Sequence, residues 1–114
     1  MAIDLPETDL TRVWRWCQQR IPEHAQHQLR LEHEIRGHDV ILVERRVPGD
    51  APDAPFGPHW TARPLARLRH SAGGWRLYWP DSNTRWHLLD DVPAAVSVVP
   101  LLEALDDPRR AFHG

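Results

Sequence analysis

The segment from Pro64 to Leu89 constrains the fold most, because it contains three short amphipathic runs separated by two turn signals. The middle run, Trp75 to Trp79, alternates apolar with polar side chains, and this period of two is typical of a strand with one buried face. The last run, Trp86 to Leu89, continues the alternation. We therefore expect a three-stranded antiparallel meander. Its predicted inner face contains Trp75, Leu77, Trp79, Trp86 and Leu88.

The outer face of this meander is predicted to be rich in arginine. In the run Leu65 to His70, inward-pointing Ala66 and Leu68 would leave Arg67 and Arg69 on the other side. The residues expected on the outer face are Arg67, Arg69, Arg76, Tyr78, Arg85 and His87. From Arg63 to His87 the formal charge is +4, whereas from Leu88 to Asp107 it is −5. We expect these oppositely charged segments to neutralise each other in part within the fold.

The chain before the meander predicts a helix and then a hairpin. Apolar residues recur at helical spacing at Leu10, Val13, Trp14, Cys17 and Ile21, with Thr8 or Asp9 as the N-cap and Pro22 as the stop signal. The run Leu29 to Arg36 alternates as a strand, and Gly37 then permits a turn. The following run, Val40 to Val43, is apolar on both faces, which indicates an interior strand.

Two further segments complete the predicted architecture. Residues 47–59 contain four prolines and two glycines and form a surface loop, and residues 98–105 form a short helix capped near Ser97. The fold class is therefore α+β. One domain over residues 1–114 would contain an antiparallel sheet of about five strands, with the N-terminal and C-terminal helices on its aromatic face. The predicted core comprises Val13, Trp14, Leu42, Leu68, Trp75, Leu77, Trp79, Trp86 and Leu102.

Composition excludes several kinds of protein and of chemistry. The single cysteine cannot form an internal disulfide, no apolar run is long enough to span a bilayer, and the first residues lack the pattern of a secretory signal. We expect a cytoplasmic protein with no membrane association. All 14 basic residues are arginine, which excludes chemistry that needs a lysine.

The ordered combination of several short motifs resembles a small bacterial family known only as a domain of unknown function. The matching positions run over nearly the whole chain, from about Leu10 to Gly114: Glu44-Arg45-Arg46, Trp60, Leu77-Tyr78-Trp79, Trp86-His87, Asp107-Pro108, Phe112 and Gly114. The chain departs from the family pattern at His113, where tryptophan is usual. This resemblance implies no function.

No motif predicts a metal or a cofactor. His33 and His38 are five residues apart, so on a helix they would not share a face, and His24 with His27 lacks further ligands. Cys17 lies in an apolar helical stripe and is expected to be a core residue. The remaining catalytic candidates are Glu44, at the end of the interior strand, and His87. We expect Glu44 to be held by an arginine such as Arg46, because an ionised carboxylate there needs a partner.

The arginine-rich outer face is the best candidate for binding. Guanidinium groups and flat rings can hold anions, protein partners or unstacked bases. The binding candidates are Arg46, Arg67, Arg69, Arg76, Tyr78, Arg85 and His87. Alternatively, Glu32 and Glu34 pair with arginines across the sheet and form a ladder of modest stabilising value.

We predict a non-enzymatic binding or accessory module whose Arg/Tyr/His sheet face recognises a protein partner or a small anionic ligand. Two alternatives remain open. One is a small lyase, isomerase or hydrolase that uses Glu44 and His87, and the other is a single-stranded nucleic-acid-binding domain, which the net charge of −2 disfavours.

Overall fold

Five strands form one antiparallel sheet in which each strand pairs with its neighbour in the sequence. The computed structural model describes residues 5–25, 28–47 and 60–107. The strands are β1 (Leu29–Arg36), β2 (Asp39–Arg46), β3 (Thr61–Ser71), β4 (Gly74–Pro80) and β5 (Trp86–Leu88). The predicted α+β class and the hairpin followed by a meander are confirmed. The predicted loop at residues 47–59 lies, except for Val47, outside the described residues.

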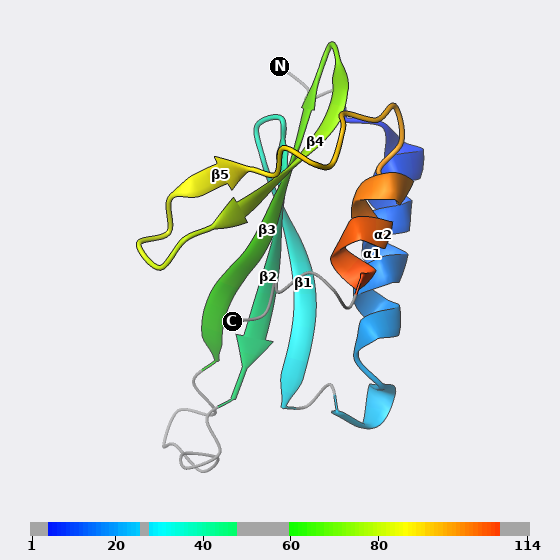
Figure 1. The fold of residues 1–114 in the computed structure, drawn as a ribbon. Coiled ribbons are helices and arrows are strands. Elements are labelled where there is room, and N and C mark those ends of the chain that lie inside the picture. The colour runs from blue at the N-terminus through cyan, green and yellow to red at the C-terminus, as the bar shows by residue number, and fades with distance from the viewer. Residues whose placement is uncertain (1–4, 26–27, 48–59, 108–114) are drawn as a thin grey trace.

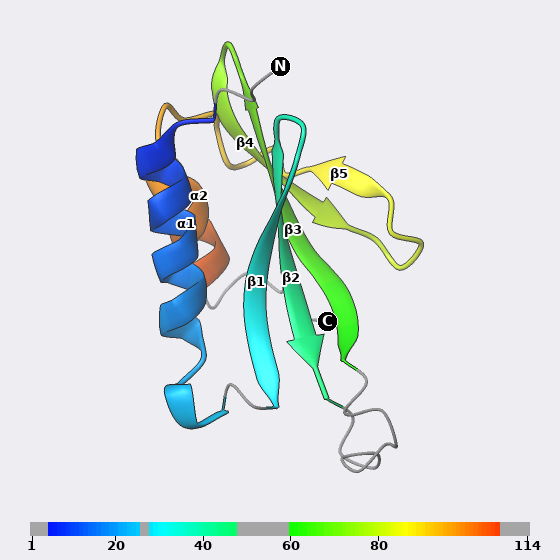
Figure 2. The ribbon, with the colours of Figure 1, turned by 180° about the vertical axis from the view of Figure 1, so that it is seen from behind.

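Two helices cover one side of the sheet. They are α1 (Glu7–Arg20), followed by the short 3₁₀ helix η1 (Glu23–Ala25), and α2 (Val99–Asp106). Figures 1 and 2 show α1 and α2 side by side on the same side of the sheet, while the end of β4, β5 and the turn between them project away from the helices. None of the described helices is long and apolar enough to cross a membrane.

The hydrophobic core lies between the helices and the sheet face that they cover, which we call the inner face. Six residues of the predicted core are buried there: Val13, Leu42, Leu68, Trp75, Leu77 and Leu102. β2 is an interior strand, as its two apolar faces predicted, because β1 and β3 flank it. The predictions for Trp14 and Trp79 are wrong, since they are 52% and 38% exposed.

Helix α1 begins two or three positions earlier than predicted and turns a different face inward. Its N-cap is Pro6 rather than Thr8 or Asp9, and Asp9 lies inside the first turn with its side chain buried. Trp14 lies beside the buried stripe and faces solvent, whereas Trp16 packs against the core. At the other end of the chain, the Ser97 hydroxyl accepts the backbone N–H of Val99 at 3.1 Å, close to the predicted cap of α2.

The side chains of β5 lie on the opposite faces of the sheet from those predicted. Leu88 pairs with Tyr78, and His87 pairs with Trp79. Directly opposed residues in a sheet point to the same side. Leu88 and Trp86 therefore lie on the outer face with Tyr78, while His87 lies on the inner face. The five residues between β4 and β5 set this register, and the alternation within a strand as short as β5 cannot reveal it.

Candidate functional site

Two arginines of β3 share one aspartate on the outer face of the sheet, the face that neither α1 nor α2 covers. Arg69 donates from Nε to Oδ1 of Asp39 at 2.8 Å and from Nη2 to Oδ2 at 3.2 Å. Arg67 also donates from Nη2 to Oδ2 of Asp39. The register causes this arrangement, because Asp39 opens β2 directly opposite Arg69. A fork-shaped guanidinium that binds both carboxylate oxygens is held in one orientation.

Asp39 is almost fully covered, although it is charged. The residue is 6% exposed, so the two guanidinium groups replace most of its contact with water. Burial raises the pKa of the carboxyl, but the hydrogen bonds from Arg69 and Arg67 outweigh burial and leave the pKa below its ordinary value of 3.8. Asp39 is therefore ionised at neutral pH and fixes both arginines.

Aromatic rings flank this pair of arginines. The guanidinium carbon of Arg69 lies 5.7 Å from the centre of the Tyr78 ring, and that of Arg67 lies 5.8 Å from the centre of the Trp86 ring. Arg76 is directly opposite Arg69 in the next strand and is exposed. We call Asp39, Arg67, Arg69, Arg76, Tyr78 and Trp86 the arginine cluster. It contains three guanidinium groups and one carboxylate, so its net charge is +2.

The other half of the outer face is the cross-strand ladder considered above. Arg45 of β2 donates to Glu32 at 3.3 Å and to Glu34 at 2.9 Å, both from β1. Arg36 adds a contact to Glu34 at 3.3 Å. Here glutamates balance the arginines, whereas the arginine cluster keeps an excess of positive charge.

The structure does not place all predicted binding residues together. Arg67, Arg69, Arg76 and Tyr78 share the outer face, as predicted. Arg85 lies before β5, in the turn after β4, and both His87 and Arg46 lie on the inner face. The His87 ring stacks on Trp79 with ring centres 4.7 Å apart, and its Nε2 lies 2.7 Å from Oδ2 of Asp81. Because Asp81 also accepts the backbone N–H groups of residues 83 and 85, His87 supports the turn.

The two catalytic candidates are far apart. Glu44 lies near the end of β2 on the inner face, and its carboxylate oxygens lie 3.5 Å from Nη2 of Arg46 and 3.5 Å from Nη2 of Arg63. The expected pairing of Glu44 with arginine is thus present. His87 is in β5, and β3 and β4 separate the two strands. With neighbouring strands about 4.8 Å apart, the two backbones are separated by roughly 14 Å. The geometry therefore does not combine Glu44 and His87 in one acid-base site.

Asp39 was not predicted to belong to this site, and Trp86 was predicted on the inner face rather than the outer face. Asp39 follows Gly37 and His38, so it resembled a turn residue, although its alternation with Val40 could have placed it on the outer face. The acidic segment after Leu88 was expected to neutralise the meander, yet Arg67 and Arg69 pair with β2.

Neither a metal site nor a reactive thiol is visible in the described parts of the chain. No group of three histidine, cysteine or acidic side chains there is arranged to hold a metal ion. Burial raises the pKa of the Cys17 thiol to about 12, a value that the charge of Arg20 lowers only in part. Since the thiolate is the nucleophile, Cys17 is unreactive at neutral pH.

A family model matches almost the whole chain, from residue 2 to residue 114. The chain belongs to DUF3024, a domain of unknown function. No curated protein and no solved structure matches it. Within this DUF3024 chain, the acidic helix α2 lies on the helix-covered side of the sheet, where its Asp106 pairs with Arg20. The arginine cluster is on the opposite side.

Proposed function

We propose that this DUF3024 chain is a non-enzymatic binding module, and that the arginine cluster binds an acidic segment of a protein partner. The observation that supports the proposal is the position of Asp39, which holds Arg67 and Arg69 between two aromatic rings on the sheet face that α1 and α2 do not cover. The proposal rests on preorganisation, on composition and on charge.

Preorganisation lowers the entropy cost of binding. An arginine that becomes fixed only when a partner binds loses rotamer freedom, at a cost of about 0.5–1.5 kcal/mol for each side chain. In this protein, folding has already ordered Arg67 and Arg69. Their remaining N–H groups, together with the exposed Arg76, can donate to carboxylates of a partner.

The composition of the cluster is typical of the centre of a protein interface. Arginine, tyrosine and tryptophan contribute most to binding energy in such interfaces. Trp86 and Tyr78 flank the arginines, and Leu88, which is 44% exposed, lies opposite Tyr78 on the same face. A partner can therefore bury apolar area beside its contacts with the guanidinium groups.

The amount of charge favours a protein over a nucleic acid. Binding to DNA through its phosphates depends on the number of phosphates that basic side chains neutralise, which can be about 6–10. The arginine cluster has a net charge of only +2, and the complete chain has a net charge of −2. This charge suits two carboxylates of a peptide better than a long polyanion.

A labelled glutamate-rich peptide and a labelled single-stranded oligonucleotide are suitable probes for fluorescence anisotropy. We expect Arg76→Glu to weaken peptide binding at least about tenfold, equivalent to 1.4 kcal/mol. Arg85→Glu is the matched control, because it makes the same charge change in the turn before β5, and it should have little effect. Equal losses in the two variants would contradict the proposed surface. Tight oligonucleotide binding at physiological salt that only Arg76→Glu abolishes would favour the nucleic-acid alternative.

A second variant separates preorganisation from simple attraction. Asp39→Asn makes the cluster more positive but removes the carboxylate that fixes both arginines. If charge alone governed binding, this variant would bind the acidic peptide more tightly. We expect weaker binding, measured at a temperature at which circular dichroism shows the variant to be folded.

A further inference from the structure

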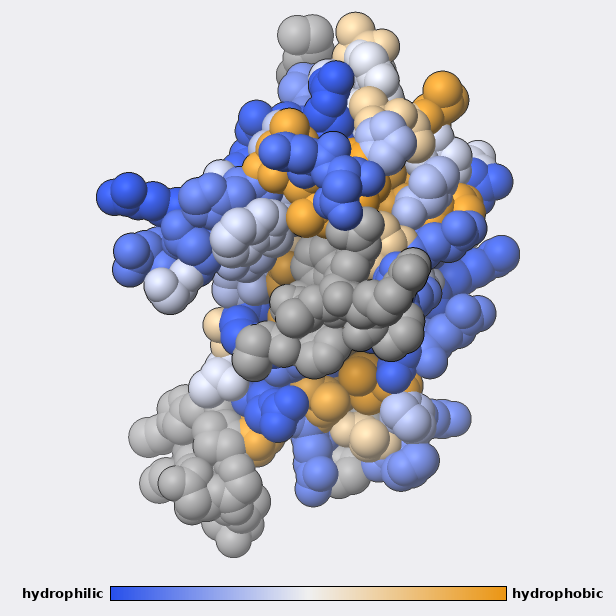
Figure 3. All heavy atoms as spheres, viewed as in Figure 1, coloured by the Kyte–Doolittle hydropathy of each residue, from blue (hydrophilic) through white to orange (hydrophobic). Residues whose placement is uncertain are grey.

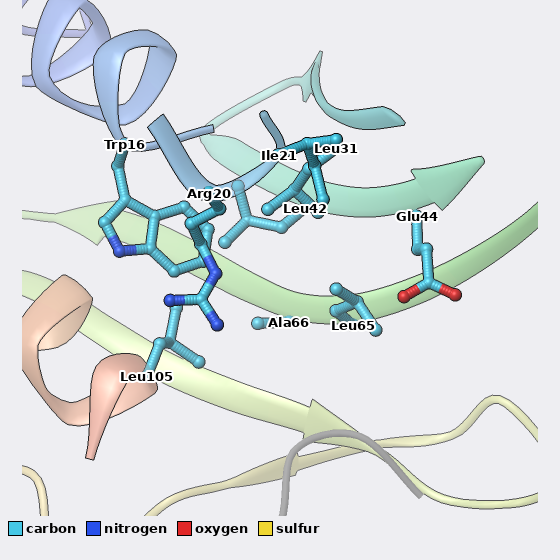
Figure 4. Close-up of a pocket in the computed structure, with 9 residues that line it drawn as sticks. All are labelled: Trp16, Arg20, Ile21, Leu31, Leu42, Glu44, Leu65, Ala66 and Leu105. Carbon is cyan, nitrogen blue, oxygen red and sulfur yellow. The ribbon is translucent and has the colours of Figure 1, made fainter. Parts of the chain in front are cut away.

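A cavity of about 210 Å³ lies on the inner face of the sheet, opposite the arginine cluster and independent of it. It is partly open to solvent and is lined by residues from the ends of α1 and α2 and from β1, β2 and β3 (Figure 4). Its walls consist of Trp16, Arg20, Ile21, Leu31, Leu42, Glu44, Leu65, Ala66 and Leu105. Apolar atoms also reach the surface over β1 in the lower half of Figure 3.

An irregularity in the sheet helps to form the apolar floor of this cavity. The pairing of β2 with β3 shifts after Leu42, so that Leu65 is an extra residue in β3. Such bulges change the direction in which side chains point and are common next to binding sites. As a result, the neighbours Leu65 and Ala66 both line the cavity instead of pointing to opposite faces.

The cavity has an ionised group at each end. At one end Arg20 lies over the Trp16 ring, 4.7 Å from its centre, and pairs with Asp106. At the other end is Glu44, whose side chain is 20% exposed. The two arginine nitrogens near its carboxylate are both 3.5 Å away, the upper limit for a hydrogen bond. The carboxylate therefore retains capacity to accept hydrogen bonds from a ligand.

We propose that this cavity binds a zwitterionic small molecule with an apolar side chain, of the α-amino acid class. The ammonium group of the ligand donates to Glu44. Its carboxylate accepts from Arg46 and Arg63, which flank Glu44 just outside the residues that line the cavity. Its side chain occupies the space between Leu31, Leu65 and the other apolar walls.

Charge and size together select this class. Two guanidinium groups near one carboxylate oppose a ligand that carries only a positive charge. A ligand that carries only a negative charge is attracted by the two arginines but offers Glu44 no donor and competes with it for them. A zwitterion has a favourable partner for each of its charges. An apolar cavity of about 150 Å³ can hold benzene. The larger volume in this structure accommodates a phenyl ring with its methylene group.

Three probes with the same ring test the proposal: phenylalanine, phenethylamine, which lacks the carboxylate, and 3-phenylpropionate, which lacks the amine. Titrations followed by ¹H–¹⁵N correlation spectra report both the affinity and the location of binding. We expect phenylalanine to bind at least about tenfold more tightly than either analogue, with shifts centred on the cavity residues. Equal affinity of the three compounds would contradict recognition of a zwitterion. Shifts outside the cavity, or no saturation at about 10 mM phenylalanine, would contradict the site itself.

Substitutions separate the ionic contact from the shape of the cavity. Glu44→Gln should weaken phenylalanine binding at least about tenfold and should leave 3-phenylpropionate binding unchanged or stronger, because the repelling charge is gone. Glu34→Gln is the matched control, since Glu34 is also half-buried and paired with arginine but lies on the outer face. It should not change either affinity. A loss of phenylalanine binding in both variants would show that the effect is not local to the cavity.

Discussion

Trp75 in β4 donates its indole N–H to the carboxylate of Asp9 in α1, with 3.0 Å between nitrogen and Oδ2. The other oxygen of Asp9 accepts the backbone N–H of Val98 at 3.2 Å and lies 3.5 Å from Nη1 of Arg12. Val98 is the N-cap of α2. One buried carboxylate therefore connects the first helix, the sheet and the start of the second helix. It also places a negative charge at the positive end of the α2 dipole.

Asp9→Ala should lower the free energy of unfolding by about 3 kcal/mol, because two buried N–H groups lose this acceptor and each loss costs roughly 1–3 kcal/mol. Urea denaturation followed by circular dichroism measures the change. Glu7→Ala is the matched control, since Glu7 is an exposed acidic residue in the same helical turn. The control should remain within about 0.5 kcal/mol of the wild type. Similar losses in the two variants would show that the buried connection contributes little.

The tryptophans of β4 should differ strongly in their contribution to stability. Trp75 is fully buried, and its truncation should cost about 3–5 kcal/mol. Trp79 is 38% exposed and stacks on His87, so Trp79→Ala should cost less than about 1.5 kcal/mol. Denaturant midpoints at constant slope give both values. Equal costs for the two substitutions would contradict this prediction, because they would mean that Trp79 contributes to the core as much as Trp75 does.

The sequence was sufficient to predict the strands, their order and most of the core, because these follow from local alternation and from turn residues. Trp75 and Leu77 show this, since each is buried as the period of two required. The same pattern could not show where the covering layer ends. Trp79 has the correct orientation but is exposed, because β4 continues beyond the helices (Figures 1 and 2).

The candidate site was predictable only in part. Arg67 and Arg69 were correctly placed on the outer face, because strand parity alone determines their orientation. Their partner Asp39 was not identified, since it depends on the register between β2 and β3, which single-strand patterns do not contain. The cavity beside Glu44 depends on a bulge and on the approach of two helices, and neither leaves a local signal.

Gly74 should tolerate no side chain, in contrast to its neighbour Gly73. Gly74 has a φ of +104°, and a Cβ atom there would lie 2.5 Å from the carbonyl oxygen of Ala95, whose backbone pairs with Trp75. A Cβ on Gly73 would meet only the movable guanidinium of Arg76, at 3.6 Å. Gly74→Ala should therefore cost more than about 1 kcal/mol. In a domain of this size that lowers the melting temperature by at least about 4 °C.

Scanning calorimetry of the two glycine variants provides the comparison. Gly73→Ala should melt within about 2 °C of the wild type, because the new methyl group requires no backbone movement. If Gly74→Ala were equally stable, the close approach of β4 to Ala95 would not constrain the backbone.

Asp39 should make the stability of the fold dependent on acid pH. Its pKa is lowered in the folded protein, so its ionised form is bound more favourably in the folded than in the unfolded chain. The stabilisation is complete above the ordinary pKa of 3.8 and is lost as the pH falls through the lower, folded value. Asp81 contributes in the same direction, because its hydrogen bond with His87 lowers its pKa.

Urea midpoints measured from pH 7 down to pH 2 test this relation. Asp39→Asn should be less stable than the wild type at pH 7 by about 2 kcal/mol, the typical value of hydrogen bonds to a charged group. Because the amide cannot titrate, the difference should shrink as the pH falls below 4, where the wild type loses the same charge. The control Asp90→Asn changes an exposed aspartate after β5 and should follow the wild-type curve. A constant difference between Asp39→Asn and the wild type at every pH would mean that the charge of Asp39 does not hold Arg67 and Arg69, and the arginine cluster would lose its proposed preorganisation.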